Sequence, residues 1–391
     1  MPFAQPVLLL AVVSAISVLS AQPRALVENI DVAPALEVPS PENVDGPIIQ
    51  LALLLDTSNS MDGLINQART RLWSIVNEMS AIAVAGEVPQ LQVALYQYGN
   101  SGISAAEDHV QLRCRFTTDL DIVSEQLFAL STNGGNEYCG AVLREALTEL
   151  SWVGTGRKHV LRLVVIAGNE PFNQGTEPFG EWTSHAMKRD IRINTIFCGP
   201  EQEGRRTLWE QGALSGNGYY AFINQDYQEP EIETPFDDAL KQLNDALNGT
   251  YIGYGRRGAE SLKRQEMQDQ FNASASVSGF FSRVLSKSSS NYATGSWDLV
   301  SGVEDGSIAL EDIDSKSLPE EYRGLSPVEL EQRIDLLVIE RTRIQNEIVE
   351  VSKKRREFIK QALTNQNASE SERLDDALIR ALLKQAVEAG F

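Results

Sequence analysis

One stretch, residues 47–61, constrains the fold of this chain more than any other. Ile48 to Leu55 is an apolar run interrupted by a single Gln, and it leads directly into Asp56, Ser58 and Ser60. A run of this length without polar alternation is typical of a strand buried on both faces of a parallel sheet. Because open α/β sheets place their sites beyond the carboxyl ends of the strands, we expect the polar residues to form a site there.

The three polar residues offer oxygen ligands at a spacing that suits a hard divalent cation. Asp56 contributes a carboxylate, while Ser58 and Ser60 contribute hydroxyl groups. A small octahedral ion such as Mg2+ accepts such oxygens and keeps several of its waters. The alternative is that the same residues cap the helix that follows, a role that Asp and Ser favour.

Strand and helix patterns alternate from residue 47 to residue 249. Short apolar runs bounded by turn residues predict strands, and apolar positions that repeat every three or four residues predict helices. After the first strand, strands are expected at 91–98, 110–116, 159–167, 191–198 and 218–223, and helices at 64–82, 121–130, 140–152, 180–187, 205–214 and 236–247. This alternation predicts a doubly wound, mainly parallel α/β sheet.

The D-x-S-x-S motif after an apolar first strand resembles the metal-ion-dependent adhesion site of von Willebrand factor A (vWA) domains. The resemblance runs from residue 48 to residue 247, and residues 212–221 are similar to the segment that leads into the last strand of that family. It implies a Rossmann-like vWA domain over 47–249, in a protein of the bacterial exported type. It also implies a non-enzymatic module that recognises a protein ligand at the metal face.

Two places in the adhesion site depart from the family pattern. Residues 134–140 stand where the family has G-G-T-x-T-G, and Gly168 stands where it has the Asp of T-D-G. Glu137 and Glu170 lie nearby in sequence and could reach a cation, or they could be exposed loop acids. We therefore expect a degenerate site for Mg2+, with Mn2+ or Ca2+ as alternatives. Its expected ligands are Asp56, Ser58, Ser60 and Glu137, with Glu170 as a further candidate.

The beginning of the chain has the pattern of an export signal. An apolar run at 7–19 precedes a Ser-Ala-Gln-Pro segment, so we expect a signal peptide at 1–21, with a retained membrane anchor as the alternative. Residues 22–46 are rich in proline and acids, which predicts an extended linker. No later run reaches the 18 apolar residues of a membrane span. We expect export to the periplasm or the cell exterior, and no membrane span after signal removal.

The net charge and the absence of catalytic motifs each disfavour certain classes of function. A formal charge of −20 and an isoelectric point near 4.7 disfavour nucleic acid and anionic membranes as partners, because both would repel the chain. The sequence carries no G-x-S-x-G, H-E-x-x-H or P-loop motif. We therefore expect a protein that is not an enzyme.

Three cysteines cannot all pair within one chain, so at least one thiol is expected to stay free. In the fold that the resemblance implies, Cys139 and Cys198 lie near the same rim of the sheet. We expect these two to form a disulfide, as is common in exported proteins, and Cys114 to remain a thiol.

Two segments follow the expected domain. Residues 250–324 form a connecting segment that is partly helical, and 325–391 have a strong helical pattern. Ser326 and Glu329 have the spacing of a capping box, in which each side chain satisfies the other residue's backbone N–H group.

The expected helices at the end of the chain need an apolar partner. From Leu330 onward apolar residues recur on alternating steps of four and three, the spacing of a coiled coil, and a second helix is expected at 370–389. Residues 325–391 therefore predict a helical hairpin or an oligomeric coiled coil. We favour the hairpin, because Arg341 and Arg355 occupy core-type positions and would repel their copies in a parallel dimer.

Two functional hypotheses follow. The first is an exported module that binds a protein ligand through a cation at the Asp56 site, where a carboxylate of the ligand would complete the metal shell. The second is a structural or scaffolding protein whose vWA domain holds no metal and whose C-terminal helices carry the interaction, including self-association through 325–391.

Overall fold

The computed structural model describes residues 46–391 except 83, 85, 225, 228–230 and 366–373. The expected signal peptide at 1–21 and nearly all of the expected linker at 22–46 lie outside the described residues. In the part that the structure describes, no helix is both long enough and apolar enough to cross a membrane.

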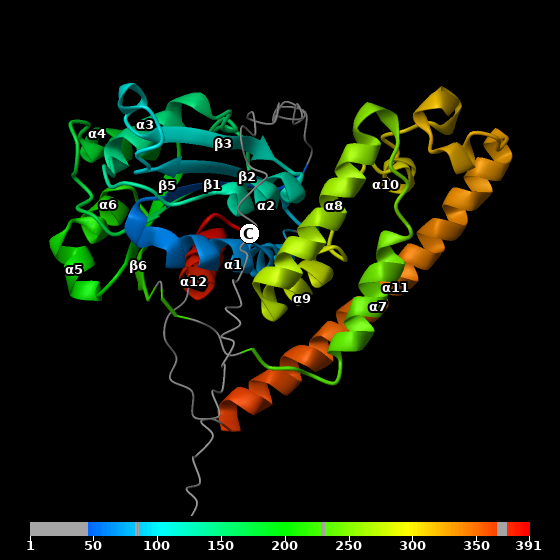
Figure 1. The fold of residues 1–391 in the computed structure, drawn as a ribbon. Coiled ribbons are helices and arrows are strands. Elements are labelled where there is room, and N and C mark those ends of the chain that lie inside the picture. The colour runs from blue at the N-terminus through cyan, green and yellow to red at the C-terminus, as the bar shows by residue number, and fades with distance from the viewer. Residues whose placement is uncertain (1–45, 83, 85, 225, 228–230, 366–373) are drawn as a thin grey trace, which may run out of the picture. The chain divides into compact units, whose positions relative to one another are not determined.

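A six-stranded sheet organises the first half of the chain (Figure 1). Its order is β3-β2-β1-β4-β5-β6, and every neighbouring pair is parallel except β2 and β3. The strands are β1 (Ile48–Asp56), β2 (Gln90–Tyr98), β3 (Val110–Thr117), β4 (Val160–Gly168), β5 (Ile191–Cys198) and β6 (Tyr220–Ile223). The doubly wound, mainly parallel sheet predicted from the alternating pattern is confirmed, with the apolar run at its centre.

Helices cover both faces of the sheet. On the first face lie α1 (Asp62–Ser80) and α2 (Leu120–Ala129), and on the second lie α3 (Cys139–Glu149), α4 (Phe179–Lys188) and α6 (Trp209–Ser215), after the short α5 (Glu201–Arg206). Alternate residues of β1 point to opposite faces of the sheet. Leu51 and Leu53 pack with α1 and α2, whereas Ala52 and Leu54 pack with α3. This two-sided burial explains why β1 carries no polar alternation.

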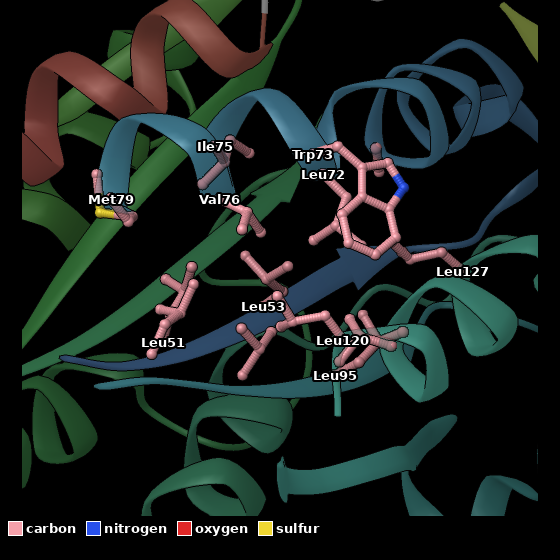
Figure 2. Packing of buried hydrophobic residues seen from close by; sticks show 14 of the residues in the cluster. Leu51, Leu53, Leu72, Trp73, Ile75, Val76, Met79, Leu95, Leu120 and Leu127 are labelled. Atoms are coloured by element: carbon pink, nitrogen blue, oxygen red, sulfur yellow. The ribbon is translucent and has the colours of Figure 1, made fainter. Parts of the chain in front are cut away.

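The core under α1 shows how the sheet and its first helix hold together. Figure 2 shows Leu51 and Leu53 of β1 and Leu95 of β2 facing Trp73 and Val76 of α1. All five side chains are at most 6% exposed. Because burying one such side chain contributes roughly 1.5–3 kcal/mol, this layer holds α1 against the sheet.

The second half of the chain is mainly helical. Its helices are α7 (Asp237–Asn248), α8 (Gly255–Ala275), α9 (Val277–Ser286), α10 (Leu299–Glu304), α11 (Pro327–Asn365) and α12 (Leu374–Glu388). The capping box predicted before α11 is confirmed: the Ser326 N–H donates to Glu329 Oε2 at 2.8 Å, and the Glu329 N–H donates to Ser326 Oγ at 3.3 Å.

The two C-terminal helices pack on different parts of the chain, which corrects the predicted hairpin. Helix α11 lies along α7, α9 and α10, whereas the described part of α12 packs on α1 and on β4, β5 and β6 (Figure 1). The arginines at core-type positions explain the difference. Arg341 Nη1 lies 2.7 Å from Asp298 Oδ2, and Arg355 Nε lies 2.9 Å from Asp237 Oδ1. The apolar seam of α11 therefore packs against other helices of the same chain.

The predicted disulfide between Cys139 and Cys198 is also wrong. All three cysteines are buried free thiols. Cys198 belongs to the apolar cluster under α1, and Cys139 belongs to the cluster under α3. The two thiols share a rim of the sheet, but the sheet itself separates them.

Candidate metal centre

The site begins where three neighbouring strands end. Asp56 is the last residue of β1, its register partner on β2 is Tyr98, and β4 ends beside it at Gly168. The chain then turns sharply: the Thr57 N–H donates to the Tyr98 carbonyl at 2.8 Å, and the Ser58 N–H donates to Asp56 Oδ1 at 2.7 Å. The Asp56 side chain is fully buried in this turn.

The two serines project from the turn between β1 and α1. Ser58 Oγ and Ser60 Oγ lie 3.2 Å apart, with Ser58 buried and Ser60 exposed. The short 3-10 turn Asn59–Met61 receives no side-chain cap from Ser58, and the residue that precedes α1 is Met61, whose side chain gives no cap. The structure therefore does not favour helix capping as the role of these residues.

The loop between α2 and α3 places a second carboxylate at the site. Backbone hydrogen bonds tie this loop to the turn, from the Asn133 N–H to the Thr57 carbonyl at 2.9 Å and from the Asn59 N–H to the Gly134 carbonyl at 3.0 Å. The Glu137 N–H donates to Gln174 Oε1 at 2.5 Å. These contacts hold Glu137 in place with 3% of its surface exposed.

A glycine makes room for the two carboxylates. Gly99 follows β2 with a φ of +78°, and a Cβ there would lie 2.8 Å from both Asp56 Oδ1 and Glu137 Cγ. A side chain at this position would be strained and would collide with both acids. The Asp56 and Glu137 side chains therefore converge over the backbone of Gly99.

The convergence leaves two oxygens without a partner. Asp56 Oδ2 and Glu137 Oε2 are buried and accept no hydrogen bond. Burial, and then the adjacent Glu137 carboxyl group, raise the pKa of Asp56 well above its usual range, and burial also raises the pKa of Glu137. A proton shared between the acids, or a cation between them, relieves this cost. The donor set thus fits a hard divalent cation.

The end of β4 differs from the family pattern for a steric reason. A Cβ on Gly168 would lie 2.6 Å from Tyr98 Oη and 3.1 Å from Asp56 Oδ2, so no side chain fits there without a shift. The next residue reaches the site instead: Asn169 Nδ2 donates to Ser60 Oγ at 3.1 Å. Asn169 was not among the predicted ligands, although its place one residue after an apolar strand was a usable signal.

Glu170 lies at the edge of the site. It is partly buried, and its carbonyl accepts a hydrogen bond from Trp209 Nε1 at 2.7 Å. After burial, the charge of Glu170 further raises the pKa of Glu137. The structure thus brings together Asp56, Ser58, Ser60 and Glu137, with Asn169 added and Glu170 beside them. Among the described residues no three His, Cys, Asp or Glu side chains form a metal-binding group, so hydroxyl and amide oxygens have to complete the donor set.

Comparison with known proteins decides the family. Residues 50–255, about half of the chain, match the family model described as von Willebrand factor type A domain. The chain belongs to the VWA domain family. VWA domains are protein-interaction modules, and members often bind a divalent metal at the adhesion-site motif. No curated protein matches the chain in sequence.

Solved structures of low identity are also similar to parts of the chain. BatB from Bacteroides thetaiotaomicron is 15% identical, covering 45% of this chain and 90% of that one, with a TM-score of 0.34. The SpRpn10 VWA domain is 14% identical, covering 46% and 90%, with a TM-score of 0.35. Proximal thread matrix protein 1 from the mussel byssus, solved with zinc in its adhesion-site motif, is 15% identical, covering 46% and 42%, with a TM-score of 0.34.

A tyrosine and a thiol lie next to the candidate metal site of this VWA domain. Tyr98 Oη donates to the Ala167 carbonyl at 3.1 Å, and Cys139 Sγ lies 3.8 Å from Tyr98 Oη. Burial raises the pKa of both groups well above their usual ranges. Because the thiolate is the nucleophilic form, a thiol held neutral in this way is unsuited to covalent catalysis.

Proposed function

We propose that the VWA domain of this chain is an exported, non-enzymatic module that recognises a protein ligand through a bound cation. The cation would be held by Asp56, Ser58, Ser60 and Glu137. The observation that carries the proposal is the pair of buried carboxylate oxygens, Asp56 Oδ2 and Glu137 Oε2, that have no hydrogen-bond partner. Burying an unpaired carboxylate is costly, and a divalent cation placed between two of them compensates both.

The choice of ion follows from the donor types. Carboxylate, hydroxyl and amide oxygens suit Mg2+ first, with Mn2+ and Ca2+ as alternatives. When bound, such an ion supplies a positive charge at a surface where Ser60 is exposed and Asn169 is partly exposed. A protein ligand would approach the ion from this side. Export rests on the apolar run at 7–19, which has the length of a signal peptide.

A metal-free scaffold that acts through its C-terminal helices is the second candidate. It is favoured by exposed apolar residues on the N-terminal half of α11: Val328, Leu336 and Ile339 are 61%, 59% and 68% exposed. Adjacent exposed residues of this kind often mark an interaction surface. The partner that this candidate implies is a second copy of the chain. Light scattering of the wild-type protein should then give the mass of a dimer, and the Leu336→Glu variant should give the mass of a monomer.

The melting temperature with and without a cation tests the metal proposal. A cation at 100 times its dissociation constant stabilises the folded protein by about 2.7 kcal/mol. We expect millimolar Mg2+ or Mn2+ to raise the melting temperature of EDTA-treated protein and to have no effect on Asp56→Ala. Asp335→Ala, which removes an exposed acid on α11, is the control and should respond as the wild type does. Equal melting temperatures of wild-type protein in EDTA and in each metal would sink the proposal.

A further inference from the structure

We infer that Glu137 completes the charge of the metal site from within the chain, so that the protein ligand contributes a neutral oxygen and not a carboxylate. This inference rests on the proposed cation site and specifies the kind of ligand that the site accepts. It follows from the charges that line the site, from their burial and from the way the Glu137 loop is fastened.

The chain itself supplies two carboxylates to the site. Asp56 and Glu137 are the two acids whose side chains converge over Gly99, and each holds one buried oxygen without a partner. Two carboxylates balance the charge of one divalent cation. A third acid, Glu170, directly follows Asn169, whose side chain is hydrogen-bonded to Ser60, so the region around a bound ion is already negative. A carboxylate from a partner would add a third or fourth negative charge next to a single ion.

Burial decides which ligands can be exchanged. Asp56 is fully buried and Glu137 is 3% exposed, so a partner cannot reach the positions that they fill. The open side of the site carries Ser60, which is exposed, and Asn169, which is partly exposed. Both are neutral groups, and Asn169 Nδ2 donates a hydrogen bond to Ser60 Oγ at 3.1 Å. A carbonyl, amide or hydroxyl oxygen of a partner could take a coordination position on this side without adding charge.

The Glu137 loop is fastened too firmly for its carboxylate to be displaced by a ligand. The backbone of Glu137 is held by Gln174 at 2.5 Å, and Asn136 forms a bridge with Gly99. Nearby, the Ser101 N–H donates to the Asn133 carbonyl at 3.0 Å. Because the backbone of its loop is held by several hydrogen bonds, the Glu137 carboxylate would remain a ligand of the ion when a partner binds.

The rim of the site also carries negative charge. Asp62 is exposed one residue beyond the turn and is hydrogen-bonded at 2.5 Å to Thr132 of the Glu137 loop. Together with Glu170 it makes the approach to the ion acidic, on a chain whose net charge is −20. Complementary charge favours a partner surface that carries basic residues around its neutral oxygen.

Mn2+ binding to the full chain, followed by electron paramagnetic resonance of the free ion, tests this inference. We expect wild-type protein to bind Mn2+ with an affinity that excess acetate does not increase. Glu137→Gln should weaken binding by at least about tenfold, because the ligand charge sets the affinity, and acetate should then restore part of it. Acetamide, a neutral molecule of the same size, is the control ligand. Asp335→Asn, which neutralises an exposed acid on α11, is the control variant, with Mn2+ affinity within about threefold of the wild type.

The outcomes separate this inference from the proposed function. If wild-type protein binds no Mn2+, the metal site itself is refuted and the inference falls with it. If wild-type protein binds Mn2+ but Glu137→Gln binds it equally well, or if acetate tightens Mn2+ binding to the wild type, only the inference is overturned. Glu137→Thr serves as a second variant should the Gln variant fail to fold, and circular dichroism of each variant establishes that it is folded.

Discussion

Replacing Arg341 by Leu should be among the most destabilising single changes on α11, although α11 lies far along the chain from the VWA domain core. The Arg341 guanidinium is 3% exposed and donates to Asp298 Oδ2 at 2.7 Å, to Thr250 Oγ1 at 3.0 Å and to the Thr250 carbonyl at 2.6 Å. It also lies 4.3 Å from the centre of the Tyr251 ring. Leucine fills much of the same volume but satisfies none of these groups.

The expected loss follows from what remains buried after the substitution. Asp298 is fully buried, and its remaining hydrogen bonds come from the backbone N–H groups of Ile252 and Ser301. Removing one partner of a buried ion pair costs about 3–5 kcal/mol, because the other charge stays buried without compensation. Adding Asp298→Asn to Arg341→Leu should therefore cost less than the two single changes summed, with a coupling of about 1–3 kcal/mol.

Arg343 provides a matched control on the same helix. Its side chain is 57% exposed and pairs with Glu340 and Glu347 on the surface of α11. Exposed pairs of this kind contribute about 0.5 kcal/mol or less, so Arg343→Leu should be nearly neutral. The assay is urea unfolding followed by both fluorescence and circular dichroism, with coincident transitions as the condition for quoting a free energy. If the two leucine variants lose the same free energy of unfolding, α11 is not anchored through Arg341 and the packing argument is wrong.

Two further predictions concern a buried acid, Asp119, and the end of β4. Burial and the neighbouring Asp121 raise the pKa of Asp119 to about 6, so the folded state holds this proton more tightly than the unfolded state does. The stability due to Asp119 is therefore present below pH 4 and falls by up to about 3 kcal/mol as the pH rises to 6, and Asp119→Asn should be more stable than the wild type at pH 7 but not at pH 4. Gly168→Asp restores the acid of the family pattern, yet it should lower the melting temperature and fail to increase Mn2+ affinity, because its Cβ would lie 2.6 Å from Tyr98 Oη. A stable variant with tighter Mn2+ binding would contradict the steric argument.

The sheet could be predicted because the information for it is local. In β1 the lack of alternation between Ile48 and Leu55 reflects burial on both faces, and the polar residues begin where the strand ends at Asp56. The capping box at Ser326 is local in the same sense, since its two hydrogen bonds join residues three positions apart. Patterns of this kind depend little on the rest of the fold.

The packing of α11 could not be predicted because its partners come from elsewhere in the chain. The spacing of its apolar residues indicates which face is buried but not what covers that face. Arg341 and Arg355 at core-type positions pointed away from a parallel dimer, but the acids they meet, Asp298 and Asp237, lie 43 and 118 residues earlier. Only the folded chain brings these charges together.

The site was predicted in part. Glu137 was placed beside Asp56 because residues 134–140 stand where the family has its G-G-T-x-T-G loop. In the structure this loop reaches the carboxyl end of β1 because β3 is antiparallel, so that α2, which follows it, runs back towards that edge. Asn169 was missed because the family pattern directed attention to Gly168, one residue earlier. That residue is a glycine because Tyr98 Oη occupies the space that a side chain would need, and no sequence pattern reports a contact between two different strands.

The helices after the VWA domain belong to its folding unit, as the charges buried between them indicate. Arg283 of α9 is fully buried and binds Asp121 of α2 at 2.5 Å and Asp269 of α8 at 2.7 Å. Lys287 lies 2.9 Å from Asp269, and although burial alone would raise the pKa of Asp269, the two cations lower it. A chain that ends at residue 249 would keep Asp121 and lose its cation, together with the apolar contacts of α9 and α12 on α1. We therefore expect residues 46–249 alone to be insoluble or unfolded by circular dichroism. A folded, cooperatively melting fragment would show that 249 is a folding boundary as well as a boundary between sequence patterns.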